Sequence, residues 1–465
     1  MLKGFKSHPY IPNSEPAVEA EMLKEIGLDS LDDLHSAVPE GLKLKQPLNL
    51  PSAFTSEMEL KKHVSALLRK NGNCEDNLSF LGGGCWQHYV PAVCDEINGR
   101  GEFLTAYGGE SYNDAGRFQT LFEYQSLMAE LVDMEVVNVP SIDWPQAAAT
   151  SLRMAGRINN RKRLLVCATL DPQKLKVIKN YCQPIHIVET VGYSKENGLM
   201  DLDELEAKLG PDVAAVYFEN PSFLGFVETQ VQEISKLIHD AGAEMVVGID
   251  PISMGVMAPP VSYGADIVCG DLQPLGVHMN FGGGQAGWIA TMDNPTYVME
   301  YPTRLFGICP TIVEGEYSFG DVAYDRTSFG HHREMAKEYV GTQAALWGIT
   351  AAVYLSLMGP QGMREVGETI MQNSAYLARQ LDGIPGVMPN RFGGVFFKEF
   401  VVDFNGTGKT VAQINESLLK QGIFGGFDLS ADFPELGQCA LYCATEIHSK
   451  ADMQRLAAAV KKAIA

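Results

Sequence analysis

Four short apolar segments in the middle of the chain, separated by amphipathic segments, constrain the fold more than any other feature. The apolar segments cover residues 164–168, 185–189, 214–218 and 245–249. Helical patterns lie between them, at about 172–182, 201–209 and 229–242. Because short buried strands that alternate with helices pair in parallel, with helices on both faces, this region predicts a mostly parallel α/β sheet.

The alternation returns on a smaller scale toward the C-terminus. The pattern predicts two long helices separated by Gly359-Pro360, and then a strand, a helix, a strand and a helix, at 333–358, 360–382, 396–403, 411–421, 439–445 and 449–464. The first hundred residues are polar and helical, and no clear periodicity marks 300–330. We therefore expect a helical N-terminal arm (1–100), a large α/β domain (101–315) and a smaller C-terminal α/β domain (316–465).

Composition restricts the partners and the compartment. The 465 residues carry 36 Lys+Arg against 57 Asp+Glu, a net charge of −21, which disfavours nucleic acids and anionic membranes as partners. The nine cysteines contain no Cys-x-x-Cys pair, and no apolar run reaches the length of about 18 residues that a membrane span needs. We expect a protein of the reducing cytoplasm, in which the nearest pair, Cys439 and Cys443, are buried core thiols rather than metal ligands.

A glycine-rich segment, Phe281-Gly-Gly-Gly-Gln-Ala-Gly-Trp288, matches the spacing of a dinucleotide-binding fingerprint. That fingerprint needs a helix after the glycines, so that the phosphates meet a helix N-terminus. The residues that follow, Trp288-Ile-Ala-Thr291, are strand-like. A nicotinamide site is therefore disfavoured here.

Asp250 is the main candidate for binding chemistry. It follows an apolar strand, and the carboxyl ends of parallel strands are where ligands bind in open α/β sheets. A second strand follows at about 264–270, and then the glycine turn. This order resembles the fold-type I pyridoxal-phosphate enzymes, in which the Asp pairs with the pyridine nitrogen and the second strand leads to the Schiff-base lysine. The alternative is that Asp250 only caps backbone amides in a turn.

The expected lysine is missing. No lysine occurs between Lys236 and Lys337, so this region offers no covalent anchor for the cofactor. The segment His331-His332-Arg333-Glu334 predicts no metal site, because neighbouring helical residues do not face one ligand. His88, between Trp86 and Pro91, is more typical of a packed histidine than of a catalyst.

Many short motifs, in order along the chain, resemble one family. They are Tyr10-Ile-Pro, Met22-Leu-Lys-Glu-Ile-Gly27, Ser56-Glu-Met-Glu-Leu60, His88-Tyr-Val-Pro-Ala-Val93, Phe103-Leu-Thr-Ala-Tyr107, Leu121-Phe-Glu-Tyr-Gln125, Gly264-Ala-Asp-Ile-Val268, Phe396-Phe-Lys-Glu-Phe-Val-Val402 and Thr445-Glu446. From about residue 10 to its end the chain is similar to subunit 1 (alpha) of the two-subunit glycine dehydrogenase (decarboxylating), the P-protein of the glycine cleavage system.

The resemblance implies a division of labour between two chains. The alpha chain lacks the Schiff-base lysine, which belongs to a beta subunit. The beta subunit is the main binding partner of the pyridoxal phosphate, and the two kinds of chain form an α2β2 assembly. The complex decarboxylates glycine, a small amino acid, and passes the aminomethyl group to the lipoylated carrier H protein. Residues of this chain that are candidates for lining the partner's site are Tyr107, His88, Asn113 and Asp114, and Asp250 is a vestigial or weak candidate for cofactor binding.

Three segments depart from the family pattern: 108–116, 142–147 and 331–341. The family's Tyr-Asp-Gly-Ala-Thr-Ala loop, for example, is here Ile142-Asp-Trp-Pro-Gln-Ala147, without the glycine. One interpretation is that these loops have changed without any effect on function. The other is that the changes have altered the substrate pocket, so that it handles glycine poorly. Two alternatives thus stay open: a diverged complex that acts on another small amine or amino acid, and a non-catalytic scaffold subunit.

Overall fold

The computed structural model describes residues 10–46, 48–104, 111–322, 337–338 and 344–465, without the side chains of residue 12 and residues 111–116. Two units are distinguished, Met1–Gly72 and Asn73–Ala465. In the first unit, helices α1 (Pro16–Glu25) and α2 (Glu57–Leu68) are the main elements, and the side chain of Ser56 caps α2 as the sequence predicts.

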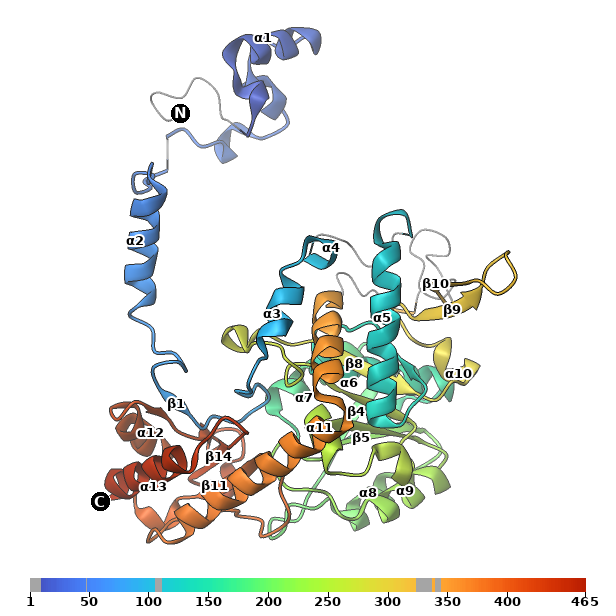
Figure 1. The fold of residues 1–465 in the computed structure, drawn as a ribbon, viewed down its shortest axis with the longest axis vertical. Coiled ribbons are helices and arrows are strands. Elements are labelled where there is room, and N and C mark those ends of the chain that lie inside the picture. Colours follow the sequence, from blue (N-terminus) through green and yellow to red (C-terminus); the bar gives the residue numbers. More distant parts are fainter. Residues whose placement is uncertain (1–9, 47, 105–110, 323–336, 339–343) are drawn as a thin grey trace. The chain divides into compact units, whose positions relative to one another are not determined.

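A seven-stranded sheet forms the centre of the second unit, in the order β2-β8-β7-β6-β5-β3-β4 (Figure 1). Its strands are β2 (Val136–Val137), β3 (Arg163–Cys167), β4 (Ile187–Val191), β5 (Val213–Glu219), β6 (Glu244–Ile249), β7 (Ile267–Asp271) and β8 (Gly287–Thr291). Strands β3 to β7 pair in parallel, while β8 runs antiparallel to β7 and β2 antiparallel to β8. The predicted mostly parallel sheet is confirmed, with β4 two residues later than expected.

Alternate residues of the strands face two separate cores. Leu165, Val216 and Val247 lie in one core with side chains of α5 (Ser111–Val132), α8 (Leu202–Lys208), α9 (Val231–Asp240) and α11 (Ala345–Asp382). Leu164 and Val246 lie in the other with α6 (Trp144–Ile158) and α7 (Pro172–Cys182). Because both faces are covered, the central strands are apolar along their whole length.

The long helix α11 is interrupted where the sequence predicts a break. Gly359 has φ 59° and ψ −178°, outside helical geometry, and Pro360 follows it. The helix begins at Ala345 and not near residue 333, where the sequence predicts its start. Residues 337 and 338, within the predicted range, are not helical.

A second, three-stranded antiparallel sheet carries the C-terminal region. Its order is β11 (Glu399–Asp403), β14 (Cys439–Cys443) and β13 (Phe427–Asp428), and α12 (Val411–Leu419) and α13 (Lys450–Ile464) pack with it. Strand β1 (Leu78–Ser79) pairs in parallel with β12 (Ile423–Phe424). The segment from residue 73, which the sequence assigns to the arm, therefore packs in the second unit beside the C-terminal region.

Three further features bear on the predictions. Strand β8, not a helix, follows the glycine-rich segment, which agrees with the exclusion of a dinucleotide site. All nine cysteines are free thiols. Within the described ranges, no helix has both the length and the apolar character that a membrane crossing requires.

Candidate functional site

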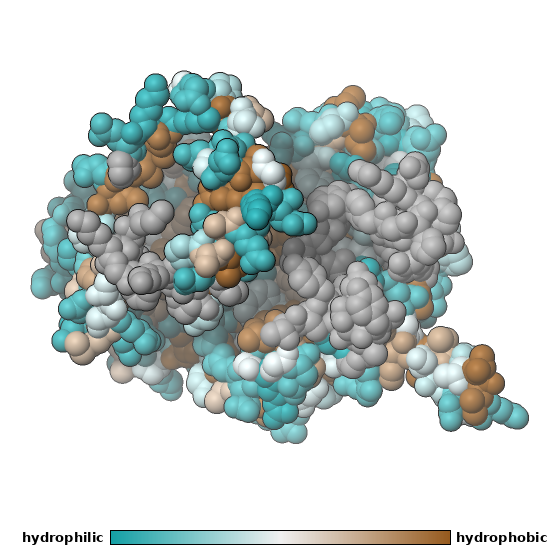
Figure 2. Space-filling model, turned by 90° about the horizontal axis from the view of Figure 1, so that it is seen from above, coloured by the Kyte–Doolittle hydropathy of each residue, from teal (hydrophilic) through white to brown (hydrophobic). Residues whose placement is uncertain are grey.

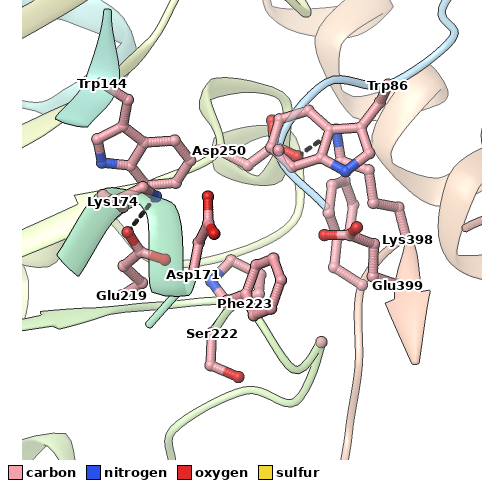
Figure 3. Close-up of a pocket in the computed structure, with 14 residues that line it drawn as sticks. Trp86, Trp144, Asp171, Lys174, Glu219, Ser222, Phe223, Asp250, Lys398 and Glu399 are labelled. Carbon is pink, nitrogen blue, oxygen red and sulfur yellow. Dashed lines mark hydrogen bonds and ion pairs between the residues drawn. The ribbon is translucent and has the colours of Figure 1, made fainter. Parts of the chain in front are cut away.

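A small pocket lies at the carboxyl edge of the parallel sheet. Two of the carboxylates that line it come from this edge, since Glu219 ends β5 and Asp250 follows β6. The pocket has a volume of about 30 Å³, and its lining includes Trp86, Trp144, Asp171, Lys174, Glu219, Asp250, Lys398 and Glu399 (Figure 3). This is the edge at which the sequence predicts ligand chemistry.

Lys398 enters the pocket just before strand β11 and holds Asp250. Its Nζ is 2.5 Å from Asp250 Oδ2 and 2.9 Å from His88 Nε2. It also lies 3.8 Å from the centre of the Trp86 ring, within cation–π range. The buried ammonium group therefore lies beside a carboxylate, an imidazole nitrogen and the face of an indole ring.

His88 connects Lys398 to a second carboxylate. Its Nδ1 is 2.8 Å from Glu446 Oε2, and the other oxygen of Glu446 accepts a hydrogen bond of 2.7 Å from the Tyr89 backbone N–H. Because Lys398 donates to Nε2, the hydrogen bonding assigns the proton of the neutral ring to Nδ1. Burial opposes ionisation of Glu446, but the His88 ring and the Tyr89 N–H outweigh it and lower the pKa of Glu446 to about 2.

A similar arrangement stands on the opposite side of the pocket. The ammonium group of Lys174, on α7, pairs with Glu219 and lies 3.5 Å from the centre of the Trp144 ring. Trp144 is itself fixed, because its Nε1 donates a 3.0 Å hydrogen bond to the hydroxyl of Tyr217. Tyr217 in turn donates to Glu219 at 2.8 Å.

Both helices that begin at the pocket have their first N–H groups already engaged. At the start of α6, Asp143 accepts from Gln146 N at 2.8 Å, Asp271 accepts from Trp144 N at 3.3 Å, and Pro145 has no N–H. At the start of α7, Asp171 accepts from the backbone N–H of residue 173, and a proline again occupies the first turn. A helix N-terminus binds anions through free N–H groups, so neither start is available for a phosphate.

Burial also leaves two carboxyl groups that titrate near neutral pH. It raises the pKa of Glu399 to about 7, although the Gly83 backbone N–H donates a 2.7 Å hydrogen bond to this group. It raises the pKa of Asp271 to about 7 as well, against three backbone N–H groups that stabilise the charged form. Glu399 lines the pocket with Asp171, Glu219 and Asp250, whereas Asp271 lies outside the lining. Both lysines of the lining are paired.

The structure joins two of the predicted site residues and leaves three undescribed at the level of side chains. Asp250 and His88 meet through Lys398. Asp250 also caps a turn, since its Oδ1 accepts a 3.0 Å hydrogen bond from Ile252 N, but its ion pair with Lys398 shows that capping is not its only contact. Tyr107 lies outside the described residues. Asn113 and Asp114 belong to α5, but their side chains are not described.

Sequence reasoning missed most of the pocket. Lys398 and Glu446 stand in motifs that carry the family resemblance, but no role follows from those motifs alone. One signal was available: a Lys-Glu pair interrupts an otherwise apolar strand at 398–399, and buried charges are rare unless they are paired. Trp144, Lys174 and Glu219 gave no comparable signal.

The sequence matches the Glycine cleavage system P-protein family over residues 8–459. The chain belongs to this family. A relative in Staphylothermus marinus, named probable glycine dehydrogenase (decarboxylating) subunit 1, is 38% identical over 462 residues, or 97% of each chain. A relative with the same name in Pyrococcus horikoshii is 38% identical over 460 residues, or 98% of this chain and 99% of that one.

Solved structures agree with this membership. A crystal structure of glycine decarboxylase (P-protein) of the glycine cleavage system, in inhibitor-bound form, matches with a TM-score of 0.86 and 31% identity, over 99% of this chain and 100% of that chain. A sphingosine-1-phosphate lyase from Burkholderia pseudomallei matches with a TM-score of 0.66 over 92% and 94% of the two chains, at 12% identity, and shows the fold alone. The fold is that of the fold-type I pyridoxal-phosphate enzymes, as predicted.

Proposed function

We propose that the chain is the alpha subunit (subunit 1) of a pyridoxal-phosphate-dependent glycine decarboxylase complex, acting in the cytoplasm beside a lysine-bearing beta subunit. One observation carries the proposal: the match to the P-protein family spans residues 8–459, while no lysine lies between Lys236 and Lys337. The first supports the reaction, and the second supports a role that does not anchor the cofactor.

The residues of this chain do not fit pyridoxal phosphate. Asp250, at the position that would pair with a pyridine nitrogen, is already paired with Lys398. The first N–H groups of α6 and α7 are engaged by carboxylates, so a phosphate finds no helix N-terminus. A volume of about 30 Å³ is far below the roughly 300–1,000 Å³ of pockets that hold small-molecule ligands. We therefore assign the cofactor to the partner.

In this assignment the partner would hold the pyridoxal phosphate, which would supply the electron sink that decarboxylation needs. The aminomethyl group then passes to a lipoylated carrier H protein. The alpha chain shapes the cleft beside the partner's cofactor and helps to dock the carrier. Tyr107, His88, Asn113 and Asp114 remain our candidates for bordering that cleft, and His88 is buried in contact with Lys398.

Exposed apolar side chains support an obligate partner. On α2, Leu60, Val64, Leu67 and Leu68 share one face at helical spacing, and all four are exposed. The hairpin of β9 (Phe306–Pro310) and β10 (Tyr317–Asp321) also projects from the second unit with hydrophobic side chains at its surface (Figure 2). Obligate interfaces commonly bury 2,000 Å² or more, and apolar surface of this kind is their usual material.

Co-expression with a lysine-bearing beta homologue tests the partnership. We expect one co-eluting complex, consistent with α2β2, at micromolar concentration. Replacing Leu60 and Leu67 by Asp should separate the chains, because the two residues lie on the apolar face of α2. The control is Met58→Asp, since Met58 is more exposed than Leu60 and Leu67 but lies on another face of the same helix. Separation of the wild-type chains would contradict the proposal.

Exchange of the glycine carboxyl group with labelled bicarbonate, assayed with a lipoylated carrier, tests the reaction. Turnover of about 1–10³ s⁻¹ would support glycine as the substrate. Exchange with another small amino acid in place of glycine would indicate the diverged complex. The filled pocket favours one second candidate, a non-catalytic scaffold. A beta subunit that exchanges equally fast without this chain would establish that role.

A further inference from the structure

The pocket contains two matched units, each made of an ammonium group between a carboxylate and an indole ring. Lys398 lies between Asp250 and Trp86, and Lys174 lies with Glu219 and Trp144. The two units face each other across the pocket (Figure 3). All these side chains are buried. The two lysines are therefore part of the interior of the protein and not surface residues that happen to lie near a carboxylate.

A carboxylate beside the face of an aromatic ring is the chemistry by which proteins recognise ammonium ions. Removal of a charged group from water is costly, and a buried ammonium persists only when its protons and its charge are both satisfied. Lys398 meets this requirement through Asp250, His88 and Trp86. The pocket is thus built as a receptor for cations, and the chain supplies those cations itself.

The two lysines arrive from different parts of the fold. Lys174 belongs to α7 on the central sheet, whereas Lys398 precedes β11 of the C-terminal sheet. Lys398 also contacts His88 and Trp86 in the segment that leads away from β1. The ion pair with Asp250 therefore joins three regions of the second unit: the central sheet, the C-terminal sheet and residues 86–88.

We propose that Lys174 and Lys398 are internal ligands of two ammonium cages, and that Lys398 replaces a bound cation as the partner of Asp250. Both side chains close the pocket, and the Lys398–Asp250 pair clamps the C-terminal sheet to the central sheet without any cofactor. The inference concerns this chain alone, and it holds whatever reaction the partner subunit catalyses.

A direct consequence can be tested by truncation. Lys398→Ala removes the atoms beyond Cβ, which correspond to n-propylammonium, and leaves Asp250 and Trp86 in place. The full-length variant should unfold at a lower temperature than the wild type. At 100 mM, n-propylammonium should restore at least half of that loss and change tryptophan fluorescence, since Trp86 is one of four tryptophans.

Three comparisons make the test specific. The neutral probe n-propanol should restore little, because it cannot pair with Asp250. Lys398→Met, which fills the space without charge, should not respond to n-propylammonium. The control variant Lys420→Ala removes an exposed lysine and should behave as the wild type does. Equal rescue by propanol, or an equal response of the wild type, would overturn the proposal.

A double-mutant cycle covers the case in which Lys398→Ala does not fold. Asp250→Asn should lower the unfolding midpoint of the wild type, because it leaves the Lys398 ammonium without its counter-charge. In the Lys398→Met background the same change should have at most half of that effect. Additive losses would show that the two groups do not act as a pair. Micromolar binding of pyridoxal phosphate to the wild-type chain, abolished by Asp250→Asn, would equally refute an internally filled pocket.

Discussion

Replacement of Glu446 by glutamine should destabilise the second unit in a pH-dependent way. Both oxygens of Glu446 accept hydrogen bonds, one from the His88 ring and one from the Tyr89 backbone N–H. Glutamine offers only one oxygen, so one of the two donors would face an NH₂ group. If that donor is the buried His88 ring, it is left without an acceptor. A buried donor without an acceptor costs more free energy than the removal of both partners of a hydrogen bond.

The size of the effect follows from the pKa. The pKa of Glu446 falls from 4.5 to about 2 in the folded chain. A difference of this size corresponds to at most about 3 kcal/mol, since one unit is about 1.4 kcal/mol and the lowering includes the charge of a protonated His88 ring. Because the folded pKa is lowered, this stability is fully present above pH 4.5 and is lost as the pH falls toward 2. For a unit of roughly 390 residues, about 3 kcal/mol corresponds to a shift in melting temperature of about 4 °C.

Thermal melts of the wild type and Glu446→Gln between pH 7 and pH 3 measure this directly. The gap in midpoint should be largest at pH 7, and less than half of it should remain near pH 3. Glu416→Gln is the matched control, because Glu416 is exposed and pairs only with Lys420 on the same helix. Equal midpoints at pH 7, or a gap that does not narrow on acidification, would refute the reasoning.

Three further predictions follow from the same region. Incubation of the isolated chain with pyridoxal phosphate, followed by borohydride reduction and peptide mapping, should give no stoichiometric adduct at a single lysine; one such adduct would contradict the assignment of the cofactor to the partner. Gly225→Ala should lower the melting temperature by several degrees, because Gly225 has φ +90° and an added Cβ would stand 2.2 Å from the backbone oxygen of Glu399; an unchanged melt would show that this contact relaxes freely. Glu399→Gln should gain stability relative to the wild type as the pH rises from 4.5 to 7, because the raised pKa of Glu399 makes its ionised form costly in the folded chain; a constant difference across that range would contradict it.

The sequence predicted what depends on local pattern. The strands and helices between 163 and 249, the break at Gly359, and the position of Asp250 after a buried strand all follow from periodicity and from residue type. The absence of an anchoring lysine follows from the positions of the lysines in the sequence, none of which lies between Lys236 and Lys337. These features need no knowledge of which distant segments meet.

The parts that were not predicted depend on distant pairing. Lys398 is 310 residues from His88 along the chain, and Glu446 is 358 residues from His88. Periodicity assigns each of these residues to a strand or a loop but does not say which strand approaches which loop. The same reason explains segment 73–100, whose polar helical pattern gives no sign that β1 pairs with β12.

The pairing of β1 with β12 and of His88 with Glu446 has a consequence for biosynthesis. Ribosomes add about 5–20 residues per second, so roughly 20–70 s pass between the synthesis of the first and second members of the His88–Glu446 pair. For most of that interval the nascent segment after residue 73 has neither its β-strand partner, which comes at residues 423–424, nor its carboxylate. The second unit can thus close only after Glu446 has been synthesised, and a chain interrupted before that residue would be released with this segment open to proteases and chaperones.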